Sequence, residues 1–174
     1  MMAMLPLAVP GIVVAFGYLA MTRPGQPFDW LIIGEDPLLL LVIAYAVRRL
    51  PYVVRSASAG FQQVSPALEE AAQNLGASPE RALWRITLPL VAPNLVAGGL
   101  LAFAFAMLEV SDSMILAQQA AHFPITKAIY SLILSLGNGP QLAAALGVWA
   151  MIFLTITIAG ASVLLGKKLG ALFR

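Results

Sequence analysis

Cysteine is absent from this chain of 174 residues, and charged side chains make up only 10% of it. The lack of cysteine excludes disulfides, thiolate metal sites and cysteine nucleophiles. The scarcity of charge argues against a soluble domain, in which about 25% of the residues are usually charged. Because the net charge is only +2, nucleic acid is not an expected partner.

Long hydrophobic runs make up most of the sequence. Hydrophobic residues make up 60% of the chain and its mean hydropathy is +0.88, which indicates an integral membrane protein. A helix crosses a bilayer with about 20 apolar residues. Four segments approach that length, and the second does so only if Arg48 and Arg49 snorkel to the interface. The predicted spans are 4–22, 37–54, 90–108 and 142–165.

The uncharged stretch 128–166 is too long for one span, and the sequence GNGP at 137–140 interrupts it. The segment 124–136 before the interruption is too short to cross a membrane. Its apolar residues recur with helical spacing, which places them on one face. This pattern predicts a helix that either lies in the membrane interface or re-enters the membrane. The residues on that face are Ile129, Leu132, Ile133 and Leu136.

The basic residues are distributed unequally between the two predicted sides of the membrane. With four spans, eight of them share a side with the loop 48–89 and the C-terminus, against Arg23 and Lys127 on the other side. Cytoplasmic loops carry the excess of lysine and arginine. We therefore expect residues 48–89 and the C-terminus to be cytoplasmic. The eight are Arg48, Arg49, Arg55, Arg81, Arg85, Lys167, Lys168 and Arg174.

The segment 55–89 is predicted to form a helical hairpin rather than an irregular loop. Ser65 and Pro66 are typical of an N-cap and a first helical residue, and they precede the good helix formers ALEEAAQNL. Gly76 follows at the position where a glycine enters the left-handed region without steric penalty. The first helix is therefore expected to end in a sharp turn at this glycine.

A second helix is predicted directly after the turn. Ser78 and Pro79 repeat the start signal, and Pro89 is expected to end the helix just before the third span. The hairpin is either a capped surface loop that joins two spans or an element that docks on a partner. The small side chains of Ala71 and Ala72 fit both interpretations, because alanine favours helix and also lets another surface approach closely.

The hairpin sequence EAAQNLGASPERALWRITLP resembles the cytoplasmic EAA motif of ATP-binding-cassette importer permeases. The match comprises Glu-Ala-Ala, a glycine after three further residues, and Ile-x-Leu-Pro after nine more. Three other stretches look like permeases of the ferric-iron type: VPGIVVAFGYL, RRLPYVVRSASAGFQQV and ITLPLVAPNLVAGGLLAFAFAMLEVSDS. The matched motif positions are Glu70, Ala71, Ala72, Gly76, Ile86, Leu88 and Pro89.

This resemblance implies an all-α, polytopic transmembrane bundle with the type I importer permease (MetI-like) fold, formed as a single domain by residues 1–174. Permease domains of this kind usually have six spans, so four spans imply that N-terminal helices are lacking. Residues 65–75 would be the coupling helix that docks on a separate ATPase subunit. Glu69 joins the matched motif positions in this predicted interface.

The resemblance also implies the setting and the partners. The protein would lie in a bacterial or archaeal plasma membrane, in contact with lipids. Its partners would be the ATPase subunit, a second permease domain, and a periplasmic or lipid-anchored solute-binding protein. No cofactor is implied. The expected substrate is iron(III), with thiamine, a polyamine or a phosphonate as alternatives.

The remaining candidate residues are Glu109 and Asp112, which lie three apart at the outer end of the third span. They either line an outer mouth of the pathway or are solvated residues of the membrane interface. The chain has no phosphate-binding loop of the form G-x-x-x-x-G-K-[ST], so ATP hydrolysis is expected in another subunit. A membrane-embedded enzyme would need paired ionisable groups within the spans, and none is evident. A non-functional or partial permease fragment, or a helical membrane scaffold, remains an alternative.

Overall fold

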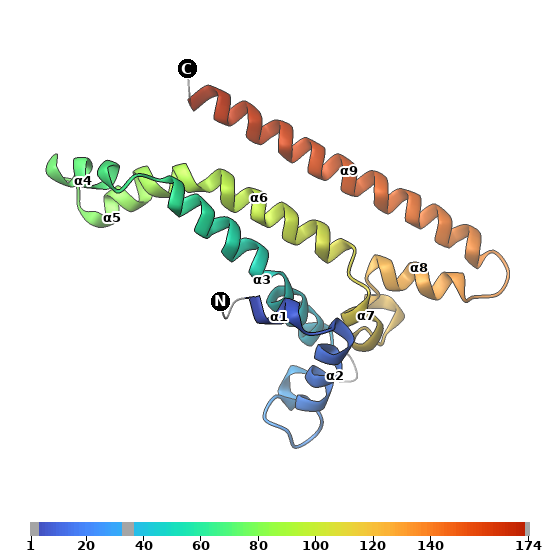
Figure 1. Ribbon diagram of the computed structural model, residues 1–174. Helices are drawn as coiled ribbons and strands as arrows, with labels where there is room; N and C mark the ends of the chain where they lie inside the picture. The colour runs from blue at the N-terminus through green and yellow to red at the C-terminus, as the bar shows by residue number, and fades with distance from the viewer. Residues whose placement is uncertain (1–3, 33–36, 173–174) are drawn as a thin grey trace. The chain divides into compact units, whose positions relative to one another are not determined.

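The computed structural model describes residues 4–32 and 37–172, which form helices and no strand (Figure 1). Arg174, one of the cations predicted to be cytoplasmic, lies outside these ranges. The expected all-α fold is therefore confirmed for the described residues. The elements are α1 (Leu5–Ala8), α2 (Gly11–Met21), η2 (Asp29–Leu31), α3 (Leu38–Gln63), α4 (Pro66–Asn74), α5 (Pro79–Ala82), η3 (Leu83–Thr87), α6 (Leu88–Met107), α7 (Ser111–Leu116), η4 (Ala120–His122), α8 (Ile125–Ile133) and α9 (Gly139–Leu172).

The chain divides into two compact units. The first comprises Met1–Pro51 and Ala104–Ala159, and the second comprises Tyr52–Phe103 and Gly160–Arg174. The first unit contains α1, α2, η2, α7, η4 and α8, together with parts of the long helices. The second contains α4, α5 and η3, again with parts of the long helices.

Two helical runs in the described residues are long and apolar enough to cross a membrane. One comprises Pro79–Met107, in which α5, η3 and α6 follow one another without a break, and the other is Gly139–Val163 of α9. They contain nearly all of the predicted third and fourth spans. Large apolar side chains remain exposed along α9, as expected for a surface that faces lipid or another membrane helix. They include Leu142, Val148, Trp149, Met151, Ile152 and Ile156.

The predicted first span, 4–22, is not one helix in the structure. It breaks between α1 and α2, where Val9 is extended with φ −102° and ψ 135°. The following Pro10 explains the break, because its ring disfavours the helical conformation in the residue before it and it has no N–H. The remaining helix, α2, has 11 residues, which is too short to cross a bilayer by itself.

The helix at the predicted second span, 37–54, runs on beyond that range: α3 continues without interruption to Gln63. Within the second unit, this later part of α3 packs against α6: the hydroxyl of Ser56 donates to the carbonyl oxygen of Asn94 at 2.7 Å. Residues 55–63, which were expected to belong to the hairpin, are therefore the end of α3, and α4 follows them.

Small residues allow this close packing of α3 on α6. A Cβ atom built on Gly98 would lie 2.6 Å from the Cβ of Ser56 and 3.2 Å from the Cα of Val53. A Cβ built on Gly60 would lie 2.9 Å from side-chain atoms of Asn94 and Val91. Helices in membranes associate largely through such close contacts, since lipid chains are as apolar as the side chains.

The first unit has its own apolar core. It brings together α2, η2, the first part of α3 and the segment around α7, and Ala15, Leu40 and Leu116 are almost wholly buried. Partly buried residues pack around it, including Leu19, Ile43 and Phe123. This core positions the polar cluster described below.

Candidate functional site

The turn between α4 and α5 has the predicted geometry. Gly76 adopts φ +89°, the left-handed conformation that favours glycine. Its N–H donates to the carbonyl of Gln73 at 2.9 Å, and the N–H of Ala77 donates to the carbonyl of Ala72 at 3.0 Å. These two bonds form a Schellman motif, which satisfies the last carbonyls of α4 and reverses the chain.

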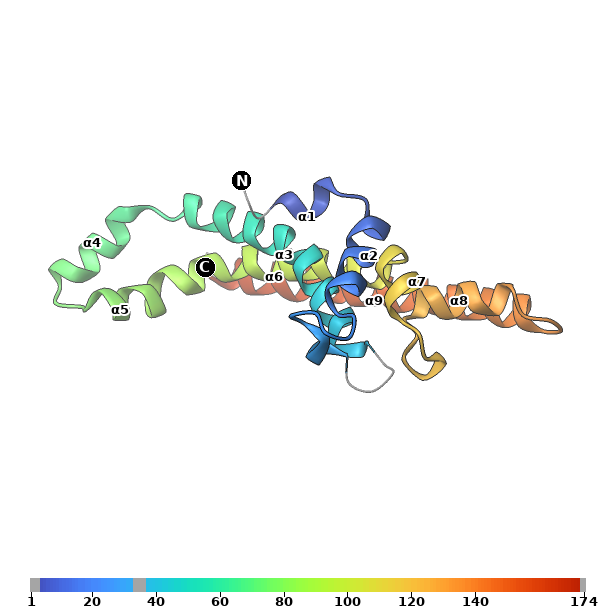
Figure 2. The same cartoon turned by 90° about the horizontal axis from the view of Figure 1, so that it is seen from below.

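The two helix starts of the hairpin also follow the sequence. Ser65 occupies the N-cap of α4 with Pro66 as the first helical residue, although its side chain makes no capping hydrogen bond. Ser78 occupies the N-cap of α5, and its hydroxyl accepts a hydrogen bond from the N–H of Arg81 at 3.3 Å. Figure 2 shows α4 and α5 as the two arms of a hairpin between α3 and α6.

The first arm of the hairpin is exposed. Every residue of α4 lies at least partly at the surface, and Glu70 and Ala71 are exposed. Leu75, at the end of the helix, is 89% exposed. Leu68 and Trp84 also show large apolar surfaces. Exposed apolar residues beside charged ones are typical of a surface that binds another protein.

The two adjacent glutamates of α4 differ in their surroundings. Glu70 is exposed, whereas Glu69 is half-buried and accepts a hydrogen bond from the hydroxyl of Thr87 in η3. Thr87 is 3% exposed. The residue pattern did not indicate this contact, because Thr87 stands at the variable position of the Ile-x-Leu-Pro part of the motif.

The last matched positions of the motif lie within the continuous run from α5 to α6. Ile86 belongs to η3, while Leu88 and Pro89 open α6. Pro89 was expected to end the second helix, and this expectation is wrong. The backbone widens into a π turn instead, in which the N–H of Leu88 donates to the carbonyl of Leu83. This turn lies just before Pro89, which has no N–H for the carbonyl four residues earlier.

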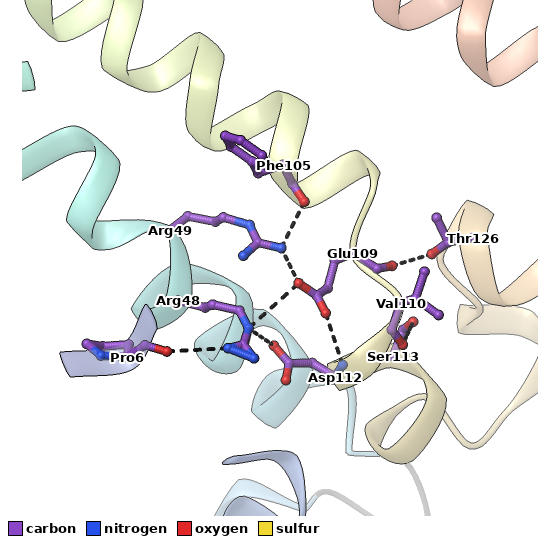
Figure 3. A network of polar contacts seen from close by, with 9 residues as sticks. All are labelled: Pro6, Arg48, Arg49, Phe105, Glu109, Val110, Asp112, Ser113 and Thr126. Atoms are coloured by element: carbon purple, nitrogen blue, oxygen red, sulfur yellow. Dashed lines mark hydrogen bonds and ion pairs between the residues drawn. The ribbon is translucent and has the colours of Figure 1, made fainter. Parts of the chain in front are cut away.

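A second polar site lies in the first unit, beyond the end of α6 (Figure 3). The guanidinium of Arg49 pairs with the carboxylate of Glu109 and donates to the carbonyl of Phe105 at 2.8 Å. The Nε atom of Arg48 lies 3.2 Å from the carboxylate of Asp112 and 3.7 Å from that of Glu109. We refer to Arg48, Arg49, Glu109 and Asp112 as the charge cluster.

Neighbouring elements complete the charge cluster. Arg48 donates to the carbonyl of Pro6 in α1 at 3.3 Å, and Gly11 leaves room for the Arg48 side chain because a Cβ there would collide with it. The hydroxyl of Thr126 in α8 donates to the main-chain carbonyl of Glu109. The cluster therefore connects α1, α3, α7 and α8 within the first unit.

The charge cluster is buried. Arg49, Glu109 and Asp112 are all less than 10% exposed. The predicted snorkelling of Arg48 and Arg49 to an aqueous interface is therefore wrong, and so is the alternative that Glu109 and Asp112 are solvated. A sequence signal was present, since two cations and two anions stand in otherwise apolar stretches and buried charges are usually paired.

The two carboxyls respond differently to burial. Burial raises the pKa of Asp112 above its usual range, even though Arg48 lies beside it. Burial acts the same way on Glu109, but the hydrogen bonds from Arg49 and from the N–H of Asp112 outweigh it and hold the pKa of Glu109 below its usual range. Glu109 is therefore the firmly ionised partner of the two arginines.

Lys127 occupies a third polar position, in α8, where it is partly buried. Its ammonium donates to the carbonyls of Met114, at 3.1 Å, and Ala117, and it lies 4.7 Å from the centre of the Phe123 ring. Burial lowers the pKa of Lys127. The ammonium caps the C-terminal end of α7, where helix carbonyls attract a cation.

In the described residues, two apolar helical runs long enough to cross a membrane and an exposed capped hairpin are features typical of a helical membrane protein. The sequence matches the family model of the binding-protein-dependent transport system inner membrane component over residues 1–163. The chain belongs to this family. It is thus a permease of a binding-protein-dependent ABC importer and a multi-pass protein of the inner membrane, with the type I permease fold.

Curated relatives support the same assignment. The molybdenum transport system permease protein ModB of Escherichia coli (strain K12) is 32% identical over 183 residues, which covers 98% of this chain and 75% of ModB. The molybdate/tungstate transport system permease protein WtpB of Methanocaldococcus jannaschii is 34% identical, covering 56% of this chain and 38% of WtpB. The ferric transport system permease protein FbpB of Actinobacillus pleuropneumoniae is 32% identical, covering 63% of this chain and 15% of FbpB.

Proposed function

We propose that the chain forms part of a translocation pathway and couples it to a separate ATPase through the hairpin of α4 and α5. The main support for this proposal is the exposure of α4. Glu70 and Ala71 face solvent, and Leu75 at the end of the helix is 89% exposed. An apolar side chain so bare gains free energy when a partner covers it, at roughly 25 cal/mol for each Å² of apolar surface. The proposed partners are this ATPase, a second permease domain and a solute-binding protein.

We propose that the hairpin faces the cytoplasm. Arg48 and Arg49 are left out when basic residues are counted on each side of the membrane, because they pair with Asp112 and Glu109. Six basic residues still share the hairpin side with the C-terminus, against Arg23 and Lys127 on the other side, so the positive-inside rule gives the same orientation. The six are Arg55, Arg81, Arg85, Lys167, Lys168 and Arg174.

The substrate that we propose is a tetrahedral oxyanion, molybdate in the first place. This proposal is supported by the molybdenum permease that matches 98% of the chain and by the molybdate/tungstate permease. Iron(III) is the second candidate, supported by the ferric permease. Both substrates require the same coupling function of this chain.

The coupling function is tested by co-purification of the tagged chain with the ATPase subunit expressed beside it. We expect wild type to retain the ATPase and Glu70→Lys to lose it, because the substitution reverses a charge on the exposed face of α4. Glu80→Lys is the matched control, since it makes the same change at an exposed residue that is not one of the matched motif positions. Loss of the ATPase from the control, or its retention by Glu70→Lys, would contradict the proposal.

The substrate is tested by uptake into vesicles that contain the assembled importer with its binding protein. ATP-dependent accumulation of radioactive molybdate, with competition by tungstate, is the expected result. Accumulation of iron(III) without molybdate uptake would favour the second candidate. ATP-dependent uptake of neither would reject both substrates and leave the coupling function untouched.

A further inference from the structure

The hydrogen bond between Thr87 and Glu69 occupies a distinctive place in the second unit. Thr87 is the last residue of the π turn η3, directly before α6, and Glu69 lies in the middle of α4. The bond therefore joins the exposed helix of the hairpin to the beginning of a membrane-spanning helix. π turns are rare and often occur at functional positions.

α4 lies against α5 and η3, but apolar packing restrains it only weakly. The helix has nine residues, none of them buried, so it gains little from hydrophobic packing. Its chain connections are the link from α3 and the turn at Gly76, where the chain reverses. Contacts without a buried residue fix the orientation of a helix only loosely. A hydrogen bond from the middle of α4 to Thr87, the last residue of η3 directly before α6, fixes it more firmly.

The bond is also of a strong type. The hydroxyl of Thr87 donates to a carboxylate oxygen, and bonds to ionised acceptors are about twice as strong as neutral ones. The Thr87 side chain is almost wholly shielded from water, at 3% exposed, so solvent competes little for it. Ala82, at 1% exposed, is a small buried residue one turn earlier in the same run.

We propose that Thr87 is a positioning residue for coupling, which makes α4 and the first turn of α6 move together. Glu69 and Glu70 then have separate roles: Glu70 faces the ATPase, and Glu69 transmits the displacement of α4 to α6 through Thr87. This inference rests on the proposed function. It adds a residue at a variable position of the motif and assigns Glu69 to the inside of the hairpin.

The test compares Thr87→Val with Thr87→Ser in the assembled importer. Valine keeps the shape and removes the donor, whereas serine keeps the donor. We expect Thr87→Val to retain the ATPase on co-purification and to hydrolyse ATP, but to transport about fivefold less substrate per ATP, in line with the loss of one buried hydrogen bond. Thr87→Ser should restore the ratio. A wild-type ratio in Thr87→Val, or no rescue by serine, would overturn the inference.

A second pair of variants approaches the bond from Glu69. If the two residues act through each other, Glu69→Leu combined with Thr87→Val should lower transport per ATP no further than Glu69→Leu alone. Additive losses of transport per ATP would overturn the inference, and this criterion applies even where Thr87→Val alone folds poorly. Glu70→Lys keeps the two proposals apart: retention of the ATPase by that variant contradicts docking through α4, whereas a normal ratio in Thr87→Val contradicts only the positioning role.

Discussion

Arg49 donates from one guanidinium nitrogen to both the carboxylate of Glu109 and the main-chain carbonyl of Phe105. A single side chain of α3 thereby contacts both the last turn of α6 and Glu109, two residues beyond the end of that helix. Ionisable groups inside membrane proteins are costly and usually functional. Substitutions in the ion pair of Arg49 and Glu109 are therefore a sensitive test of the packing of the first unit.

Removal of Glu109 alone should destabilise the protein strongly. Glu109→Leu leaves Arg49 buried without its carboxylate, and breaking a buried pair in this way costs about 3–5 kcal/mol. The double variant Arg49→Met with Glu109→Leu should recover most of this loss, because Arg48 and Asp112 remain as a balanced pair. Thermal unfolding in detergent, followed by tryptophan fluorescence, measures both. A double variant no more stable than the single one would contradict this account.

Gly98 should tolerate no side chain, while its neighbour should. Gly98→Ala places a methyl group 2.6 Å from the Cβ of Ser56, and such overpacking costs about 1–3 kcal/mol. Gly99→Ala is the matched control, since a Cβ there meets nothing within 4 Å and alanine favours helix. The two midpoints of thermal unfolding should therefore shift in opposite directions. Equal effects would mean that α3 and α6 do not pack as described.

The turn at Gly76 should require a residue that accepts positive φ. Gly76→Val forces a β-branched side chain into the left-handed region, which costs roughly 1–2 kcal/mol of conformational free energy. The substitution should therefore loosen the end of α4. We expect weaker association with the ATPase, measured by co-purification, and little change in overall helix content by circular dichroism. Gly76→Asn should behave closer to wild type, because asparagine tolerates this conformation. Equal association in all three proteins would argue against a role of the turn.

Lys127 should hold α7 and α8 together through its ammonium. Lys127→Met keeps the apolar stem against Phe123 but leaves the carbonyls of Met114 and Ala117 without their donor. This loss should lower the free energy of unfolding by about 1–3 kcal/mol. Faster hydrogen exchange of amides in α7 and α8 is the expected result, and mass spectrometry after proteolysis detects it. Lys127→Arg retains a cation and should exchange more slowly than Lys127→Met. Unchanged exchange in Lys127→Met would show that packing alone fixes α8.

Local signals in the sequence were sufficient to predict the hairpin. Ser65, Gly76 and Ser78 act through their own backbone conformation and nearest neighbours, so their roles follow from residue type and spacing. Two of the spans were predictable for a similar reason, because length and hydropathy are properties of one segment. The docking role assigned to the hairpin stays a prediction.

The corrections concern interactions between distant segments and two prolines, Pro10 and Pro89. The pairing of Arg48 and Arg49 with Glu109 and Asp112 depends on how α3 packs, which hydropathy along the chain does not contain. Without that pairing, hydropathy alone places the two arginines at the interface with water. Pro89 was misread because a π turn let the helix continue, a rare solution compared with a helix end.

The order of the charges along the chain has a consequence for how the protein enters the membrane. Each arginine at the centre of an inserting helix costs roughly 2.5–3.5 kcal/mol, and α3 carries Arg48 and Arg49 in its middle. The carboxylate that neutralises Arg49 is made 60 positions later. During synthesis α3 is therefore a poorly inserting segment until α6 and α7 have emerged. We expect α3 to insert late, after pairing with the segment of α6 and α7 has neutralised its arginines.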